Sequence, residues 1–298
     1  MAHRGAIDAD AKTGDGSGVL TQIPYKLFRK EVTKLGHTLY DDSDLAVGVL
    51  FLPHDNAYAQ AHAKAIVEDV LEFRQLFLFG WREVPVNSMV LGDKARLTMP
   101  RIEQVLIGRP AGMNDDEYER RLFLARNEIE KRAHLDHIRN FYIVSFSHRV
   151  IIYKGLLTAA SLEKFYRDLA NPDYETAICV YHERYSTNTF PTWPLSQPFR
   201  FLAHNGEINT IRGNRNWMRA RESELMADFW GKDIDLLKPI IQPGGSDSAS
   251  LDNALEVLTM SGRGLLHSMN MLVPPAWRTD ETMAPEVKAY YEYHRCFN

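Results

Sequence analysis

The residues best suited to chemistry lie in one polar stretch, residues 181–216. Arg184 directly follows an apolar strand, and its planar guanidinium can grip a carboxylate through two parallel hydrogen bonds. Asn205 and Gly206 lie later in the same stretch. A side-chain amide beside a glycine N–H can donate two hydrogen bonds to a developing oxyanion. The stretch therefore suits a site that binds a carboxylate and polarises a carbonyl group.

A second polar cluster, residues 244–248, reads Gly-Gly-Ser-Asp-Ser. Asp247 in this cluster stands just before an expected helix, and its carboxylate can act as the counter-ion of a substrate ammonium. Together with Arg184 and the Asn205–Gly206 pair, it predicts a substrate with a carboxylate, an ammonium and a side-chain carbonyl. An amino acid with a side-chain carbonyl has all three.

Each of these residues also has a purely structural interpretation. Asn-Gly after an apolar strand is typical of a hairpin turn, because both residues tolerate positive φ. Arg184 can pair with Glu183 or another carboxylate, and Asp247 can be an ordinary helix N-cap. No single residue is specific, and the site is favoured because the three groups occur in one chain.

Two further patterns are weaker. The glycine-rich segment 14–18 lacks the Walker lysine and carries Asp15, so it is interpreted as a turn into a strand rather than a phosphate-binding loop. His134 and His137 lie near the end of an expected helix with no third ligand in view. A solvated helix face is therefore favoured over a metal site.

Composition narrows the class of protein. The chain has 298 residues, 45% of them hydrophobic, and a formal net charge of −4 with mixed signs, which argues against nucleic acid or a membrane as partner. No apolar run approaches transmembrane length. Cys179 and Cys296 are too few for a disulfide framework or an all-cysteine iron–sulfur cluster, and Cys179 is expected to be buried. An intracellular protein is the default expectation.

Hydrophobic periodicity predicts clusters of strands and helices in α+β or α/β layers, read as one domain. A hairpin is expected around residues 147–149, and Ser161 is expected to cap a helix. The expected strands are 19–23, 45–52, 76–86, 102–107, 141–146, 150–153, 176–181 and 199–203. The expected helices are 25–35, 58–73, 115–135, 161–169, 209–226, 250–260, 265–273 and 286–295.

Longer motifs enclose the candidate residues. They are HRGA at 3–6, TGDG at 13–16, RYSTNTFP at 184–191, HNGEINT at 204–210, GSDS at 245–248 and PPAW at 274–277. In this order they resemble the class II glutamine amidotransferase domain of the glutamate synthase large subunit, over essentially the whole chain. RYSTNTFP and HNGEINT are long and specific. The phosphoribosyl and hexosamine amidotransferases share only shorter elements, so they are a weaker alternative.

The resemblance implies an N-terminal-nucleophile hydrolase fold, in which two stacked antiparallel sheets lie between helical layers (αββα, four layers). It implies that residues 1–298 are part of a type 2 amidotransferase domain, which hydrolyses glutamine to glutamate and ammonia. The resemblance also implies a role for each candidate residue. Asn205 and Gly206 form the oxyanion hole, Arg184 binds the α-carboxylate of glutamine, and Asp247 binds its α-ammonium. Thr187 lines the pocket, and Arg4 supports the surroundings of the nucleophile.

The resemblance also implies groups outside this chain. In the whole enzyme, ammonia travels to a separate domain with FMN and an iron–sulfur cluster, where 2-oxoglutarate is reductively aminated. No cofactor is expected in this chain itself. The expected partners are glutamine, the rest of the large subunit and a small electron-donating subunit. The expected location is the cytoplasm, or a plastid in a photosynthetic source.

The start of the chain departs from the family pattern. The family nucleophile is a cysteine at the mature N-terminus, whose own α-amine acts as the base. This chain begins with Met1 and Ala2, and Cys179 does not match the nucleophile's position. The sequence therefore predicts a piece truncated at both ends. Two functions stay open: a glutaminase domain whose cysteine lies upstream, and a non-catalytic glutamine-binding or structural remnant.

Overall fold

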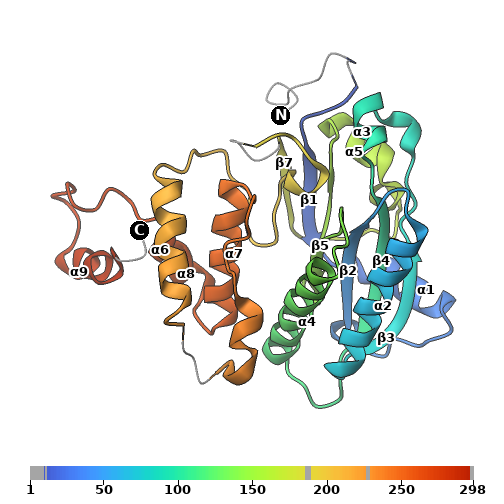
Figure 1. The fold of residues 1–298 in the computed structure, drawn as a ribbon, viewed down its shortest axis with the longest axis horizontal. Coiled ribbons are helices and arrows are strands. Elements are labelled where there is room, and N and C mark those ends of the chain that lie inside the picture. Colours follow the sequence, from blue (N-terminus) through green and yellow to red (C-terminus); the bar gives the residue numbers. More distant parts are fainter. Residues whose placement is uncertain (1–9, 11, 185–188, 226–228, 296–298) are drawn as a thin grey trace. The chain divides into compact units, whose positions relative to one another are not determined.

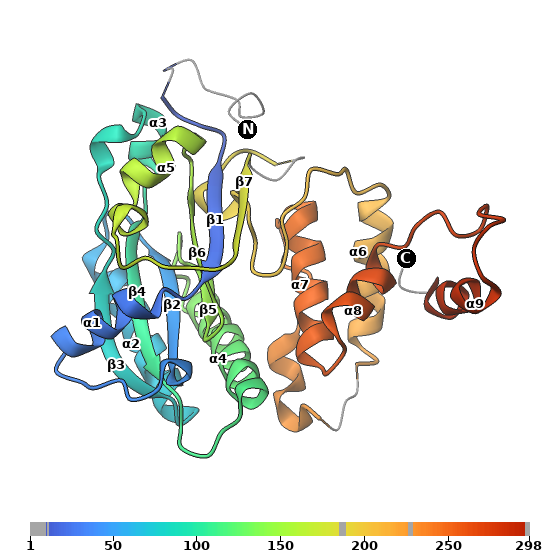
Figure 2. The same ribbon diagram turned by 180° about the vertical axis from the view of Figure 1, so that it is seen from behind.

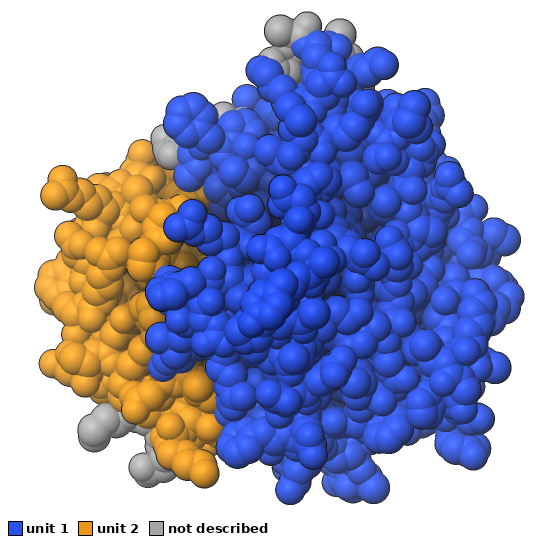
Figure 3. Space-filling view, turned by 45° about the vertical axis from the view of Figure 1, so that its right-hand side comes forward, with its two compact units in different colours: residues 1–205 blue, residues 206–298 orange. Residues whose placement is uncertain are grey.

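The computed structural model describes residues 10, 12–184, 189–225 and 229–295. The chain divides into two compact units, Met1–Asn205 and Gly206–Asn298, which are coloured separately in Figure 3. Helices and antiparallel sheets occur together, which confirms the expected mixture of helices and sheets of the α+β class.

Two antiparallel sheets form the centre of the first unit (Figure 1). A four-stranded sheet has the order β3-β4-β2-β5, and a three-stranded sheet has the order β6-β1-β7. The strands are β1 (Ser17–Gln22), β2 (Leu45–Leu52), β3 (Phe77–Glu83), β4 (Arg101–Gly108), β5 (Tyr142–Ser147), β6 (Val150–Gly155) and β7 (Cys179–Glu183).

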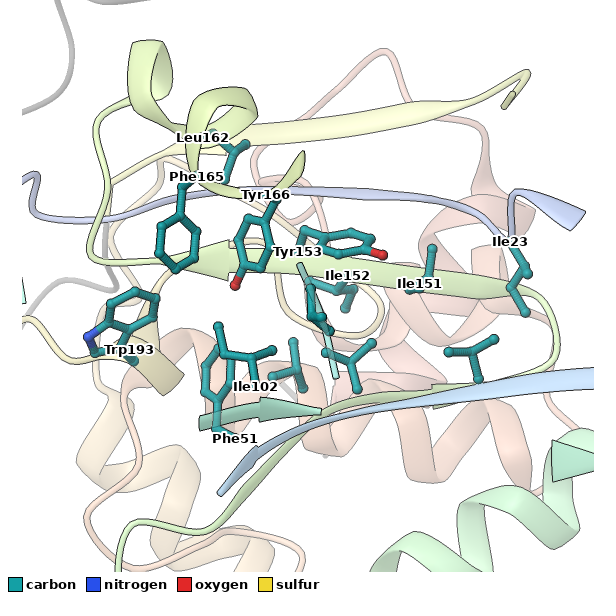
Figure 4. Close-up of a cluster of buried hydrophobic side chains, with 14 of the residues drawn as sticks. Ile23, Phe51, Ile102, Ile151, Ile152, Tyr153, Leu162, Phe165, Tyr166 and Trp193 are labelled. Atoms are coloured by element: carbon teal, nitrogen blue, oxygen red, sulfur yellow. The ribbon is translucent and has the colours of Figure 1, made fainter. Parts of the chain in front are cut away.

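The alternation of side chains along β2 separates two hydrophobic clusters. Val49 and Phe51 join a cluster that includes Tyr153 of β6, so this cluster fills the space between the two sheets (Figure 4). Leu50 and Leu52 point to the other face and join a second cluster with residues of two helices. Every residue of β2 is buried, because both faces of this strand are covered.

Helices α2 and α4 cover the outer face of the four-stranded sheet (Figures 1 and 2). The buried residues of α2 recur at the spacing of one helix face: Ala63, Ile66, Val67, Val70 and Leu71. α4 begins with a capping box, in which Asn114 and Glu117 each satisfy the other's backbone N–H. The helices of this unit are α1 (Tyr25–Lys34), α2 (Ala57–Phe73), α3 (Asp93–Leu97), α4 (Asp115–Leu135) and α5 (Ala159–Phe165).

The described residues of the second unit form helices and no strand. α7 packs against α8. The helices are α6 (Ile211–Glu222), α7 (Asp247–Met260), α8 (Leu265–Leu272) and α9 (Pro285–His294). None of the helices described in the chain is long and apolar enough to cross a membrane.

The hairpin expected around residues 147–149 is wrong. β5 pairs with β2 and β6 pairs with β1, so the short turn between them carries the chain from one sheet to the other. The side chain of Ser147 shapes this corner: its Oγ accepts the N–H of Arg149 at 2.9 Å and donates to Glu119 at 2.6 Å. The apolar faces of β5 and β6 lie across the core from each other instead of pairing along their edges.

The strand expected at 199–203 is also absent from the described structure. The N–H of Phe199 donates to the carbonyl of Leu202, and the side chain of Gln197 bonds to the backbone of His204. Neighbouring backbone and side-chain groups therefore form the hydrogen bonds that these backbone N–H and C=O groups would form with another strand in a sheet.

Two single-residue expectations also fail. Cys179 is exposed, because β7 is an edge strand whose only partner among the described strands is β1. Ser161 does not cap α5, which begins two residues earlier after Thr158; the two hydroxyls instead bond to each other at 2.9 Å. His134 and His137 are exposed, as the favoured solvated helix face requires.

Candidate active site

The side chain of Asn205 is held by a buried histidine. His182 lies in β7, is 7% exposed, and places its Nε2 2.8 Å from Asn205 Oδ1. Asn205 itself is exposed. Because the oxygen of the amide is engaged by His182, the NH2 group remains as the donor that Asn205 can offer to a ligand.

Gln197 connects the two segments that carry Asn205 and Arg184. Its side-chain Oε1 accepts the N–H of His204 at 2.9 Å, and its Nε2 donates to the carbonyl of His204 at 3.1 Å. Its own backbone N–H donates to the carbonyl of Arg184 at 3.3 Å. Gln197 is 3% exposed. Gln197 therefore fixes the backbone just before Asn205 through its buried side-chain amide, and the residue just after β7 through its own backbone N–H.

The segment around Asn205 is irregular, not a hairpin turn. Neither Asn205 nor Gly206 adopts positive φ, and no strand of the described structure directly precedes or follows them in the sequence. The hairpin-turn interpretation of Asn-Gly is therefore wrong. Gly206 is exposed and follows Asn205 as the first residue of the second unit.

Arg184 stands at the end of β7 with an unusual backbone. Its φ is 155°, in a region that favours glycine. The side chain is 49% exposed, and its Nε lies 3.4 Å from Oδ2 of Asp15. The alternative in which Arg184 pairs with a carboxylate is confirmed, with Asp15 rather than Glu183 as the partner. About half of the Arg184 side chain thus remains exposed to solvent.

Asp247 is the first residue of α7 and is 2% exposed. Ser246, not Asp247, is the N-cap, since the Ser246 side chain accepts the N–H of Ala249 at 3.0 Å. Oδ1 of Asp247 accepts the N–H of Ser248 at 2.7 Å. A carboxylate in the first turn of a helix is stabilised by the helix dipole. The N-cap interpretation of Asp247 is wrong, and the helix starts three residues earlier than predicted.

Arg215 of α6 fixes the glycine-rich segment before Asp247. Its guanidinium donates to the carbonyl of Gly245 at 2.7 Å and to Oγ of Ser250 at 3.1 Å. Both bonds lie within the second unit. The loop that presents Asp247 is thus tied to a neighbouring helix.

Two predicted site residues, Arg4 and Thr187, lie outside the described residues. Three residues that the sequence analysis did not single out take part in the arrangement: His182, Gln197 and Arg215. A signal for His182 was available, because an ionisable residue at an inward position of a short strand needs a polar partner. The described residues contain no cluster of three or more side chains suited to bind a metal.

Cys179 lies in β7 with a thiol poorly suited to attack. Partial desolvation raises the pKa of this thiol above its ordinary value. A raised pKa lowers the fraction of thiolate, which is the nucleophilic form.

The comparisons with known proteins agree with the motifs. The family described as "Glutamine amidotransferases class-II" matches residues 1–298. The chain is 46% identical over 291 residues to "Glutamate synthase [NADPH] large chain" of Azospirillum brasilense, covering 98% of this chain and 19% of the relative. It is 45% identical over 297 residues to "Ferredoxin-dependent glutamate synthase 2" of Synechocystis sp., covering 99% of this chain and 19% of the relative. The chain thus spans less than a fifth of either relative, and by its match over the whole chain it belongs to the class II glutamine amidotransferases.

Proposed function

We propose that this chain is part of the glutaminase portion of a glutamate synthase large chain, which hydrolyses glutamine to glutamate and ammonia. The observation that carries the proposal is the exposed Asn205, whose amide oxygen is engaged by buried His182. This arrangement leaves a preorganised N–H donor, which is what a site needs to stabilise an oxyanion.

The proposed roles follow the charge and exposure of each residue. Arg184 binds the α-carboxylate, and Asp15 holds its guanidinium in the absence of substrate. Asp247 binds the α-ammonium, since its buried carboxylate sits at a braced helix start. Thr187 and Arg4 keep the roles that the resemblance implies, the pocket wall and the surroundings of the nucleophile.

The proposed reaction has two halves. The thiolate of the N-terminal cysteine that the resemblance implies attacks the side-chain carbonyl carbon of glutamine, and the carbonyl oxygen becomes an oxyanion that accepts hydrogen bonds from the Asn205 side chain and the Gly206 N–H. The C–N bond breaks, and the leaving amine takes the proton of the thiol, relayed by a base, to depart as ammonia. Water then hydrolyses the thioester, which releases glutamate and restores the thiol.

Further proposals concern the fold and the whole protein. The helices α2 and α4, the four-stranded sheet and the three-stranded sheet are consistent with three layers of an αββα hydrolase fold. We propose that the whole protein uses the ammonia to aminate 2-oxoglutarate with FMN and an iron–sulfur cluster. A small electron-donating subunit is a proposed partner, and the cytoplasm or a plastid is the proposed location.

The test begins with the protein isolated from its source cells. N-terminal sequencing and intact mass identify its first residue, and ammonia and glutamate release from glutamine measure activity. We expect a free N-terminal cysteine and glutamine turnover. Calorimetry with glutamine tests the alternative: heat of binding without turnover favours a glutamine-binding remnant and overturns the enzymatic proposal.

The Asn205→Ala variant tests the oxyanion donor. We expect kcat to fall about 10²- to 10³-fold with KM little changed, because the lost hydrogen bond acts mainly in the transition state. The matched control is Asn216→Ala, an exposed asparagine of α6, which should leave both constants unchanged. A kcat loss below about threefold in Asn205→Ala would contradict the assigned role.

A further inference from the structure

We infer that His182 is a positioning residue, whose Nε2–H holds the side chain of Asn205 in the one orientation that presents its NH2 group to the reacting carbonyl oxygen. The inference rests on the proposed function and adds to it a residue that does not touch the substrate. His182 acts through Asn205 alone.

The atoms in contact determine where the proton lies. Oδ1 of Asn205 can only accept a hydrogen bond, so Nε2 of His182, 2.8 Å away, must donate. With the proton on Nδ1 instead, two acceptors would face each other at that distance. Nδ1 has no partner among the residues that the structure describes, whichever nitrogen carries the proton. The contact with Oδ1 of Asn205 is therefore what favours the Nε2–H form.

Burial makes His182 a firm support. The imidazole is almost wholly covered, and it belongs to β7, which is paired with β1 along its length. Asn205, in contrast, is exposed and lies in an irregular segment. The terminal torsion of an asparagine side chain is broad and nearly two-fold, so an unsupported amide would interchange its O and NH2 positions. The bond to His182 removes that freedom.

The consequence concerns the transition state. An amide fixed before substrate arrives needs no reorganisation when negative charge develops on the carbonyl oxygen. Loss of His182 should therefore lower kcat and leave KM almost unchanged, because the ground-state contacts of glutamine are made by other groups.

Two variants of similar size separate this role from a packing role. His182→Gln keeps an N–H near the position of Nε2, whereas the shorter His182→Asn does not reach Asn205. We expect kcat of His182→Gln to stay within about threefold of the wild type, and kcat of His182→Asn to fall about 10- to 100-fold at constant KM. Equal losses in both variants, or a loss confined to thermal stability, would overturn the inference.

A double variant gives the sharpest kinetic result. Because His182 acts only through Asn205, adding His182→Asn to Asn205→Ala should produce no further loss of kcat. Multiplication of the two separate losses would show that His182 acts by another route and would overturn the inference.

A spectroscopic measurement does not depend on activity. The ¹⁵N chemical shifts of the His182 ring, recorded on this chain, should show protonated Nε2 and unprotonated Nδ1, and Asn205→Ala should move the Nε2–H resonance. The Nδ1–H form would overturn the inference whether or not glutamine is hydrolysed. If the Nε2–H form is found but the wild-type protein from source cells releases no ammonia, the proposed function fails while the hydrogen bond stands; the catalytic consequence of the inference then fails with it.

Discussion

Arg184 combines a backbone conformation that favours glycine with a half-exposed guanidinium beside Asp15. A residue keeps a sparsely populated φ only where the surrounding structure holds it there, and such residues are often found at ligand sites. The carbonyl of Arg184 accepts a hydrogen bond from the N–H of Gln197, whose side chain also fixes His204. The unusual backbone thus belongs to the same hydrogen-bonded unit as the segment that presents Asn205.

If Arg184 has the proposed role of binding the α-carboxylate of glutamine, the Arg184→Lys variant should weaken glutamine binding while keeping the positive charge. An ammonium is a point donor and cannot reproduce the two parallel hydrogen bonds of a guanidinium to a carboxylate. We expect KM for glutamine to rise roughly tenfold or more, with a smaller change in kcat. Steady-state kinetics measure the change, and Arg212→Lys on the exposed side of α6 is the control. An unchanged KM would remove Arg184 from the carboxylate site.

For single residues, the sequence indicated which side chains are candidates for a site but not which residues they contact. Arg184, Asn205 and Asp247 could be singled out because a carboxylate-binding group, an oxyanion donor and an ammonium-binding group occur together in one chain. The pairing of His182 with Asn205 could not, because it joins a strand to an irregular segment whose backbone path no local pattern encodes. The same holds for Asp15, which lies far from Arg184 in sequence and became its partner only through the β1–β7 pairing.

Between the elements, a buried polar network joins the two sheets. Arg82 of β3 forms two hydrogen bonds of 2.7 Å to Asp168, which lies in the short 3-10 helix Arg167–Ala170. Tyr153 of β6 donates to the same carboxylate at 2.8 Å and accepts from Gln104 of β4 at 2.9 Å. Each partner satisfies the others, so the network fixes how the sheets pack.

The Asp168→Ala variant should destabilise the protein by about 3–5 kcal/mol, because it leaves the buried Arg82 without its main counter-ion. Tyr153→Phe should cost only about 1 kcal/mol, since it removes a neutral donor. Denaturant unfolding measures both. The control is Glu175→Ala, which breaks the exposed pair with Lys26 and should change stability by less than about 1 kcal/mol. Similar effects of Asp168→Ala and Glu175→Ala would contradict a structural role for the network.

The corner between β5 and β6 contains His148, and it should make stability depend on pH. Desolvation, with Arg149 and Arg109 nearby, lowers the pKa of His148 to about 4. The unfolded chain, with an ordinary pKa near 6.5, binds more protons between these values. The contribution of His148 to the free energy of unfolding should therefore be fully present above about pH 6.5. It should fall by about 3 kcal/mol as the pH drops towards 4.

Unfolding free energies across this range test the pH prediction. His148→Gln keeps an N–H able to reach the carbonyl of Asp115, which lies 3.1 Å from Nε2 of His148, but it cannot titrate. This variant should lose most of the slope that His148 contributes. An identical slope in the variant and the wild type would assign the pH dependence to other groups.

The elements show where local patterns suffice. β2 and α4 were predicted at their observed bounds, because the residues of each element alone specify it. β2 is a continuous apolar run, and α4 is a capped amphipathic helix. The partners of β5 and β6 were predicted wrongly, because a short turn between two strands is compatible with a hairpin and with a change of sheet. Only β2 and β1, distant in sequence, decide between the two.

For the whole molecule, the two units differ in how they are stabilised. Both buried hydrophobic clusters lie within the first unit. In the second unit, half or more of the buried residues of α7 are polar, and α6 buries none of its residues. This difference was not predicted from the sequence, because the polar residues of α7 at Ser250, Asp252 and Glu256 are buried although they lie beyond the predicted ligand segment 244–248.

Hydrogen exchange of the backbone amides should measure the difference in local stability between the two units. Amides protected by many buried apolar contacts open only with global unfolding, whereas a helix without buried residues opens locally at little free-energy cost. In this chain we therefore expect the slowest exchange in β2 and β4, and exchange in α6 faster by several orders of magnitude. α7 provides the comparison within the second unit, with protection between these limits because part of it is buried. If α6 exchanges as slowly as β2 in native-state measurements, surfaces other than the two hydrophobic clusters must stabilise it, and the second unit is not the less stable part of the molecule.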